Sequence, residues 1–282
     1  MKIALCNEVL QPLPFAEQCA MAAALGYDGL EVAPFTLAAD PMAITDAEAQ
    51  ALRRTAEDHG LAITGLHWLL VAPAGLSIVA EDVDTRTRTV ALMERLCELC
   101  ALMGGSYLVH GSPKQRSVPP GSTPAQARDR ARQCFALVAR VAADCGVLYC
   151  IEPLAPAETD FLNTVAEAAL LVDEIGHPAL KTMIDCSAAG QAEAVGVPQL
   201  MTQWMPRDLI GHVQVNDPNR RGPGQGAMAF ATILRTVRQM QDLGHYRGIV
   251  AVEPFDYVPD GPGCAARAIG YLRGILEAQG HG

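Results

Sequence analysis

The sequence predicts an α/β protein built as one (β/α)8 TIM barrel, in which eight parallel strands are each followed by a helix. Apolar segments of strand length alternate with segments of helical periodicity, and this pattern occurs eight times along the chain. The 282 residues are 50% hydrophobic, which is sufficient for one large core. No charge run, linker or low-complexity stretch interrupts the alternation. We therefore expect residues 1–282 to form a single domain.

Eight apolar segments are expected to form the barrel strands. Most are short, continuous apolar runs, which is typical of strands covered on both faces in a parallel sheet. In chain order they are residues 3–8, 29–33, 61–70, 106–110, 147–152, 180–185, 209–215 and 248–253. Alternation with helices places such strands side by side with the helices outside, and eight units close the sheet on itself.

The segments between these strands have helical periodicity and residues typical of helix ends. Thr45 is suited to cap the N-terminus of the second helix, and Gly60 is suited to end it. The expected helices are residues 15–25, 46–59, 84–103, 125–145, 165–175, 230–243 and 262–278. The segment 192–205 contains Gly196 and Pro198, so we expect a short or irregular helix there.

An open, doubly wound sheet is the alternative arrangement of the same elements. A dinucleotide-binding sheet of that kind carries Gly-x-Gly-x-x-Gly after its first strand, and this chain does not. In a closed barrel, the residues that follow the C-terminal ends of the strands all face one mouth. These strand ends are therefore where we expect the chemistry.

The bulk composition argues against several classes of protein. The formal net charge of −10 disfavours a nucleic-acid surface, although a local Arg or Lys can still hold an anionic substrate. No apolar run approaches the ~20 residues of a membrane span. The first residues lead directly into an apolar strand without a signal-peptide pattern, so we expect a cytoplasmic protein.

The nine cysteines are expected to be reduced thiols, because their number is odd and their spacing is not that of a secreted framework. Cys97 and Cys100 form a Cys-x-x-Cys pair within an apolar helical segment. No second pair completes a zinc site, so we expect both thiols to face the core.

Two strands end in the same unusual way. Residues 147–154 read VLYCIEPL, with Glu152 before a proline, and residues 249–255 read IVAVEPF, with Glu253 before a proline. Proline has no amide donor, so the ladder stops there and a carboxylate is placed at the end of a buried strand. Charged groups are rarely left in such a position without compensation, and a metal ion is one form of compensation.

Polar side chains recur at the other strand ends. They are Asn7, Glu8, Glu31, His67, Trp68, His110, Glu158, Asp185, His212, Gln214, Asn216 and Asp217. Glu152, Asp185 and Glu253, with a neutral donor from the seventh strand, lie about one strand–helix unit apart and would converge. Such an oxygen-rich set prefers Mn²⁺ or Mg²⁺ to Zn²⁺, and Co²⁺ is also compatible. The alternative is an acidic mouth without a metal.

The chain resembles the xylose isomerase-like sugar isomerases and epimerases, most closely the branch of ketose 3-epimerases and hydroxypyruvate isomerase-like proteins. The resemblance covers the whole barrel and is most specific in the second half. It rests on IEPLAPAE (151–158), MIDC (183–186), GHVQVNDPNRRGPGQG (211–226) and VAVEPF (250–255). These motifs are specific for the superfamily, and they say little about which substrate is bound.

The resemblance implies a site for one divalent cation and a sugar. The metal ligands would be Glu152, Asp185, Gln214 and Glu253. Glu158 and Arg220 match residues that contact the substrate. The family also implies a homodimer or homotetramer. Its expected partner is a small-molecule sugar or sugar phosphate, and neither a nucleic acid nor a membrane is expected to bind.

Two positions depart from the family pattern. The seventh-strand ligand is often the second residue of a His-x-His pair, and here it is Gln214, as in the hydroxypyruvate isomerase-like members. His212 has the same strand parity, so it is the alternative ligand or a substrate contact. Three residues after Asp185, ketose 3-epimerases usually have a substrate-binding His, and this chain has Ala188.

Four other polar residues have two interpretations each. Lys114 and Arg116 follow the fourth strand and would either meet an anionic group of the substrate or lie in a solvated loop. His67 and His110 would either orient substrate hydroxyls or be satisfied structural histidines. The sequence does not decide between these interpretations.

The expected chemistry is proton removal from a carbon next to a carbonyl. Glu152 and Glu253, on opposite faces of that carbon, would invert it through a cis-enediolate, most simply at C3 of a ketose or ketose phosphate. One Glu acting alone would give aldose–ketose or hydroxypyruvate isomerisation. A further alternative is an inosose dehydratase-like lyase, an enzyme type of the same superfamily.

Two interpretations lie outside sugar chemistry. An apurinic endonuclease resembles this fold but needs a His-rich trinuclear zinc site and binds DNA. The chain has only seven His and a net charge of −10, and both observations argue against that function. The other is a non-catalytic barrel that binds a partner. Such a protein does not require four metal ligands, and their presence in this chain argues against it.

Overall fold

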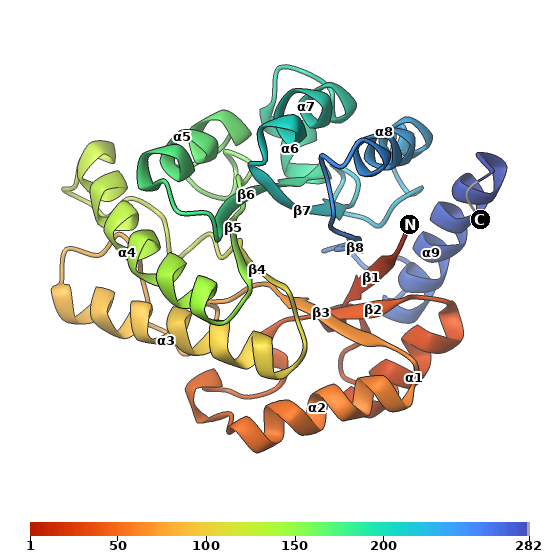
Figure 1. Ribbon diagram of the computed structural model, residues 1–282, viewed down its shortest axis with the longest axis horizontal. Coiled ribbons are helices and arrows are strands. Elements are labelled where there is room, and N and C mark those ends of the chain that lie inside the picture. Colours follow the sequence, from red (N-terminus) through yellow and green to blue (C-terminus); the bar gives the residue numbers. More distant parts are fainter. Residues whose placement is uncertain (281–282) are drawn as a thin grey trace.

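The structure, a computed structural model, describes residues 1–280 and confirms the closed barrel (Figure 1). Each strand pairs in parallel with the next, and β1 pairs with β8, so the open-sheet alternative is wrong. The strands are β1 Ile3–Cys6, β2 Gly29–Val32, β3 Ala62–Leu66, β4 Tyr107–His110, β5 Leu148–Ile151, β6 Leu180–Asp185, β7 Ile210–Val215 and β8 Val250–Val252.

The helices form an outer ring around the strands (Figure 1). They are α1 Phe15–Leu25, α2 Asp46–Asp58, α3 Val83–Leu102, α4 Pro124–Asp144, α5 Val165–Ile175, α6 Cys186–Ala192, α7 Val197–Trp204, α8 Phe230–Asp242 and α9 Gly261–Ala278. Single 3-10 turns are η1 Asn7–Leu10, η2 Pro34–Thr36, η3 Pro41–Ala43 and η4 Met205–Arg207.

Helix ends follow the predicted capping residues. The Thr45 side chain accepts a hydrogen bond from the amide of Glu48, and the Glu48 carboxylate accepts one from the amide of Thr45, which is a capping box at the start of α2. Gly26 ends α1 with φ 92°, in the left-handed region that glycine adopts without strain. These contacts satisfy main-chain groups that a helix end would otherwise leave unpaired.

Several strands end earlier than the sequence predicts. The first ends at Cys6 because the chain turns into η1, and the last is only Val250–Val252. Glu8, His67 and Glu253 therefore lie beyond the ladder, where the chain bends over the mouth. Helix α6 was not predicted, because seven residues rich in Ala and Gly carry no clear apolar period.

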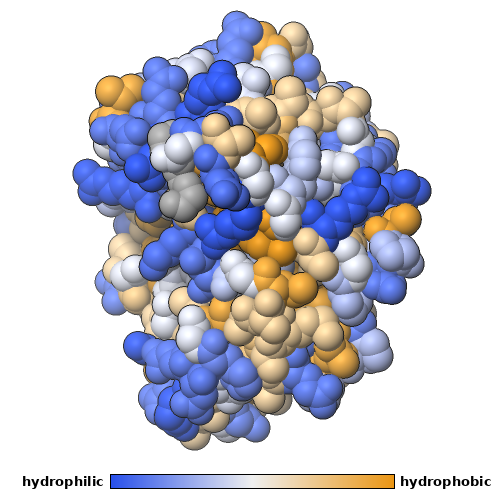
Figure 2. All heavy atoms as spheres, turned by 90° about the vertical axis from the view of Figure 1, so that its right-hand side faces the viewer, coloured by the Kyte–Doolittle hydropathy of each residue, from blue (hydrophilic) through white to orange (hydrophobic). Residues whose placement is uncertain are grey.

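The core lies inside the barrel and between the barrel and the helices. Cys97 and Cys100 are fully buried free thiols, which confirms their predicted core position. Figure 2 views the side on which α1 and α9 lie, and hydrophobic residues gather in the middle of a largely hydrophilic face. No helix within residues 1–280 is long and apolar enough to cross a bilayer.

Candidate active site at the barrel mouth

Three carboxylates meet at the C-terminal end of the barrel. Glu152 directly follows β5, Asp185 ends β6 and Glu253 directly follows β8. One carboxylate oxygen from each lies within 4.8 Å of the other two, and all three side chains are buried. The structure thus brings together three of the four ligands expected from the sequence.

The surroundings of these carboxylates disfavour their charged forms. Burial, followed by repulsion from Asp185, raises the pKa of Glu152 well above its usual range. Burial and repulsion from Glu152 and Asp185 do the same to the pKa of Glu253. Burial raises the pKa of Asp185 to about 7, although hydrogen bonds from Ala188 and Asn216 oppose this shift. A positive charge placed among the three carboxylates would lower these pKa values and favour the ionised forms.

Asn216 holds Asp185 in position. Its Nδ2 donates to Asp185 Oδ2 at 2.8 Å and to the main-chain oxygen of Glu253 at 2.9 Å, and its Oδ1 accepts from the Ser187 amide at 2.7 Å. Asp185 Oδ1 accepts from the Ala188 amide at 2.6 Å, at the start of α6. Hydrogen bonds to both oxygens fix the direction of the remaining lone pairs.

Trp68 orients Glu253. The Trp68 Nε1 donates to Glu253 Oε1 at 3.1 Å, and the indole packs edge-on against Phe255. The backbone of Trp68 has φ 52°, which is a strained conformation for a residue with a large side chain. Strained residues of this kind occur most often at functional sites. The other oxygen of Glu253, Oε2, is buried and has no hydrogen-bond partner within the described chain.

Gln214 lies at the depth of Asp185, because the two residues are partners in the register of β6 and β7. Its Nε2 donates to Glu31 Oε1 at 2.7 Å. Its Oε1 is fully buried and unpartnered among residues 1–280. An amide oxygen left free at this depth is the kind of donor that a hard cation takes.

His212 lies one layer deeper than Gln214. Its Nε2 is 2.8 Å from Glu31 Oε2, outside the direction of a hydrogen bond, and its ring stacks on Tyr107 with centroids 4.0 Å apart. Burial acts to raise the pKa of Glu31, but His212, His67 and a hydrogen bond from Tyr107 outweigh it and lower this pKa to about 2. His212 therefore lies against Glu31 and is not part of the group that the three carboxylates form.

His67 links the mouth to Glu31. Its Nε2 lies 2.9 Å from Glu8 Oε2 and 4.0 Å from Glu253 Oε1, and its Nδ1 lies 3.6 Å from Glu31 Oε1. Burial opposes its protonation, but Glu8 and Glu31 raise the pKa of His67 overall. Cys6, Glu8, His67 and Glu253 also offer ligand atoms within 4.8 Å of one another. In that second group the His67 Nε2 is already bound to Glu8, and Glu253 is shared with the first group.

Glu158 and Arg220 meet at the rim. Arg220 Nη1 lies 3.4 Å from Glu158 Oε1, and the guanidinium lies over the ring of Phe255 at 4.9 Å. The main-chain oxygen of Arg220 accepts hydrogen bonds from the amides of Phe255 and Asp256 at 2.8 Å each. The side chains are 54% exposed for Arg220 and 26% for Glu158, so both are accessible to a substrate.

His110 does not face the mouth. Its Nδ1 lies 2.8 Å from the Tyr149 hydroxyl, and its ring meets Phe135 of α4 edge-on at 5.0 Å. Alternation along β4 sends Tyr107 and Val109 into the barrel and His110 towards α4. The structure therefore does not bring His110 to the substrate.

Arg116 agrees with neither interpretation of the sequence, a substrate contact or a solvated loop residue. It is buried, and its guanidinium donates to the main-chain oxygens of Glu152, at 2.6 Å, and of His110. It thus joins the ends of β4 and β5 at the base of the Glu152 side chain. Lys114, in the same loop, is exposed.

Gly111 lets the chain lie against the Glu152 carboxylate. A Cβ at this position would overlap Glu152 Oε2. The main-chain amide of Glu152 in turn donates to the oxygen of His110 at 3.3 Å. A glycine after β4 is therefore required by the position of Glu152.

Several contacts of the site were not predicted from the sequence. Glu31, Trp68 and Asn216 were visible as polar residues at strand ends, but their partners come from distant strands. Arg116 was singled out by its charge, and a sequence offers no indication that a loop guanidinium turns inward to main-chain oxygens. Gly111 has no side chain, and its close approach to Glu152 depends on contacts between neighbouring strands.

The donor set fits a divalent cation. Three carboxylates and one free amide oxygen form an all-oxygen set, which Mg²⁺ and Mn²⁺ prefer. Glu253 Oε2 and Gln214 Oε1 are buried without partners inside the described part of the chain. Protein interiors rarely leave such acceptors uncompensated.

Two known proteins with similar sequences are sugar epimerases by name. The chain is 29% identical over 249 residues to the D-psicose 3-epimerase of Agrobacterium fabrum (strain C58 / ATCC 33970), covering 86% of this chain and 78% of the relative. It is 23% identical over 261 residues to the 3-dehydro-D-guloside 4-epimerase of Escherichia coli (strain K12), covering 90% and 92%.

A solved structure shares the fold. The D-psicose 3-epimerase from Clostridium cellulolyticum H10, crystallised with D-tagatose, superimposes with a TM-score of 0.82 at 21% identity, covering 98% of this chain and 99% of that chain. The sequence model of the family described as "Xylose isomerase-like TIM barrel" matches residues 19–275. The chain belongs to that family, which confirms the resemblance found in its motifs.

Proposed function

We propose that this member of the xylose isomerase-like TIM barrel family is a divalent-metal-dependent epimerase that inverts C3 of a ketose. The observation that carries the proposal is the convergence of Glu152, Asp185 and Glu253 within 4.8 Å at the mouth. Similarity to proteins named D-psicose 3-epimerase supports the choice of a ketose and of C3.

Four side chains would hold the metal. They are Glu152, Asp185, Gln214 and Glu253, and the preferred ion is Mn²⁺ or Mg²⁺, with Co²⁺ also compatible. When bound, the cation supplies positive charge that offsets the negative charge developing on the substrate oxygens during proton removal. Glu31 holds the Gln214 amide, and Asn216 holds Asp185, so two ligands are oriented before a substrate enters.

Glu152 and Glu253 form the proposed acid–base pair. They come from β5 and β8, three strands apart around the barrel. One carboxylate takes the proton from C3, next to the C2 carbonyl, which gives a cis-enediolate. The other, in its acid form, returns a proton to the opposite face of C3, and the centre is inverted. In the metal-free site, burial and repulsion from neighbouring carboxylates raise the pKa of both groups, which favours a state in which one of them keeps a proton.

Glu158, Arg220 and the Glu8–His67 pair are the proposed contacts for the rest of the sugar. Glu158 and Arg220 are accessible at the rim, and His67 acts through Glu8, which is partly exposed beside Glu253. His110 and His212 lie outside this set, for the reasons of strand parity and depth given above.

We propose a free ketose in preference to a ketose phosphate. Arg116 is buried and donates to main-chain oxygens, and Arg220 already pairs with Glu158 at the rim. A phosphate would therefore have to compete with an existing partner for either guanidinium.

Solvent-exchange experiments test the proposal and separate it from its alternatives. The Mn²⁺-loaded protein is incubated in D₂O with D-psicose, D-fructose, D-tagatose and L-ribulose, and with D-fructose 6-phosphate as a phosphorylated comparison. Deuterium at C3 of both epimers supports the proposal. Deuterium at C1 of the ketose, together with an aldose product deuterated at C2, identifies an aldose–ketose isomerase. A product lighter by one water identifies an inosose dehydratase-like lyase, and either of the last two results overturns C3 epimerisation.

We also propose a cytoplasmic homodimer or homotetramer, as the family resemblance implies. The apolar centre of the α1 and α9 face in Figure 2 is a surface that a second copy would cover. Light scattering at micromolar protein concentration measures the mass, and a monomer at all concentrations would contradict this assembly.

A further inference from the structure

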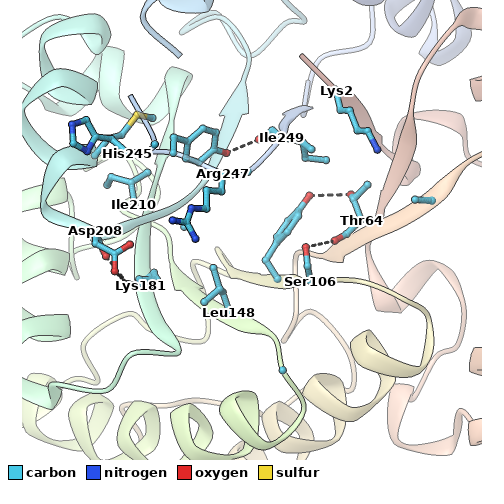
Figure 3. A pocket seen from close by; sticks show the side chains of 18 of the residues that line it. Lys2, Thr64, Ser106, Leu148, Lys181, Asp208, Ile210, His245, Arg247 and Ile249 are labelled. Atoms are coloured by element: carbon cyan, nitrogen blue, oxygen red, sulfur yellow. Dashed lines mark hydrogen bonds and ion pairs between the residues drawn. The ribbon is translucent and has the colours of Figure 1, made fainter. Parts of the chain in front are cut away.

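A cavity of about 830 Å³ opens at the N-terminal end of the barrel, opposite the carboxylates (Figure 3). Its lining comes from residues at or just before the starts of the strands, among them Lys2, Ala62, Leu148, Ile210 and Ile249. A cavity of this size lies within the range of small-molecule sites, roughly 300–1,000 Å³. Nothing in the proposed epimerase chemistry uses this end of the barrel.

The cavity is separated from the mouth by a closed layer of side chains. Tyr107 lines the cavity, and its ring stacks on His212 at 4.0 Å. The Tyr107 hydroxyl donates to Glu31 Oε2 at 2.5 Å and lies 3.0 Å from Thr64 Oγ1. These contacts fill the barrel between its two ends, so a molecule in the cavity occupies a second site and not the entrance to the first.

The wall of the cavity is mainly aliphatic. Ile63, Leu148, Ile210 and Ile249 contribute apolar side chains around the opening. Figure 3 shows Leu148, Ile210 and Ile249 on different sides of one space. An apolar body that enters this space removes aliphatic surface from water, which favours binding.

Two cations at this end have no protein partner. Within residues 1–280, neither the Lys2 ammonium nor the Arg247 guanidinium makes an ion pair or a side-chain hydrogen bond. Both line the cavity, and Figure 3 shows them on either side of the opening. Unpaired cations beside a cavity stand out in a protein whose net charge is −10.

The acidic residues of the same cavity are already paired. Asp28 accepts from Arg273 at 2.7 Å and from the Ile3 amide at 2.7 Å. Asp208 accepts from Lys181 at 2.9 Å. The free charge that remains at the opening is therefore positive, and it is complementary to an anion.

We propose that this cavity binds a small organic anion, with its carboxylate or phosphate group at Arg247, Lys2 as a second positive charge across the opening, and an apolar body against Leu148, Ile210 and Ile249. The guanidinium of Arg247 supplies directed donors for the anionic oxygens, and Lys2 supplies a second charge. The ligand is distinct from the neutral ketose of the mouth, so this site does not depend on the identity of that substrate.

Calorimetric titration of the Mn²⁺-loaded protein tests this site with three probes of equal chain length: hexanoate, hexyl phosphate and 1-hexanol. We expect one or both anions to bind at least about tenfold more tightly than the alcohol, because only the anions pair with Lys2 and Arg247. Binding of hexanoate alone identifies a carboxylate ligand, and binding of hexyl phosphate alone identifies a phosphate ester. Equal binding of all three probes, or no binding of either anion, overturns the proposal.

Variants locate the bound probe. The double variant Lys2→Gln/Arg247→Gln is expected to weaken anion binding at least about tenfold. Arg235→Gln, which removes an exposed charge on α8 away from the cavity, is the matched control and should bind as the wild type does. Glu152→Gln should also bind the anion normally, even if the proposed epimerase activity is absent. Wild-type affinity in the double variant, or lost affinity in Glu152→Gln, places the probe elsewhere and contradicts the proposal.

Discussion

A hydrogen bond of 2.7 Å from Gln214 Nε2 to Glu31 Oε1 determines that the oxygen is the free end of the Gln214 amide. Glu31 is fully buried, and its pKa of about 2 keeps it ionised, so it accepts and cannot donate. The amide must therefore turn its nitrogen to Glu31 and its oxygen away from it. The oxygen is the atom that a cation binds, and Glu31 in this way positions a ligand that it does not itself supply.

Glu31→Gln is expected to weaken Mn²⁺ binding by roughly tenfold to a hundredfold. The amide introduced at position 31 can donate a hydrogen bond, so the oxygen of Gln214 can turn towards residue 31 and away from the metal. Titration calorimetry measures the dissociation constant directly, without any substrate. Circular dichroism controls for loss of the fold. An unchanged dissociation constant in a folded variant would show that Glu31 does not orient Gln214.

Glu152→Gln and Glu253→Gln should each lower kcat by about 10²–10⁴, because each removes one member of the proposed acid–base pair. Glu17→Gln, an exposed acid on α1, is the control and should leave kcat unchanged. In a two-base mechanism the variants differ in isotope exchange: each retains slow exchange with only one of the two epimers. Full activity in either variant would remove that residue from the mechanism.

Gly111→Ala should lower kcat/KM by up to about 10²-fold, because the added methyl group overlaps Glu152 Oε2 and displaces the carboxylate. Gly270→Ala is the matched control, since a Cβ there meets nothing within 4 Å. A crystal structure of the Gly111 variant would show whether Glu152 has moved. Equal activity of both variants would mean that the displacement is tolerated.

Arg220→Gln should raise KM by about tenfold with little change in kcat, since Arg220 lies at the rim and not among the three carboxylates. Arg221→Gln is a neighbouring control, because Arg221 pairs with Asp256 instead. A large fall in kcat for Arg220→Gln, with KM unchanged, would instead place the guanidinium at the reacting carbon.

The metal-free protein should lose stability as the pH rises. Burial raises the pKa of Asp185 from 3.8 to about 7, so the folded state holds this proton more tightly than the unfolded state does. The stabilising contribution is complete below pH 3.8 and is lost as the pH rises to about 7. The raised pKa values of Glu152 and Glu253 act in the same direction.

Added Mn²⁺ should reverse this trend, because a cation competes with protons for the same oxygens. We expect the increase in Tm caused by Mn²⁺ to be larger at pH 8 than at pH 5, measured by differential scanning calorimetry. Asp185→Asn should flatten the pH dependence of the metal-free Tm and reduce the effect of Mn²⁺. A Tm increase independent of pH would indicate that the metal binds away from these carboxylates.

The sequence was sufficient to predict the barrel and the three carboxylates. Strand and helix periodicities are local properties, and eight alternations restrict the topology to very few arrangements. Glu152 and Glu253 were recognisable because proline ends a ladder within the sequence itself, and Asp185 because it ends a continuous apolar strand. Thr45 and Gly60 predicted the bounds of α2 for the same local reason.

The tertiary structure alone decided which polar side chains work together. Gln214 and His212 share a strand face and are separated only by depth in the barrel, which depends on the register between β6 and β7. Arg116 turns to main-chain oxygens and Glu31 contacts three other strands, and such contacts exist only after the barrel closes. A sequence carries the period of each strand, but the depth and the partner of a buried polar group arise from the packing of all eight strands.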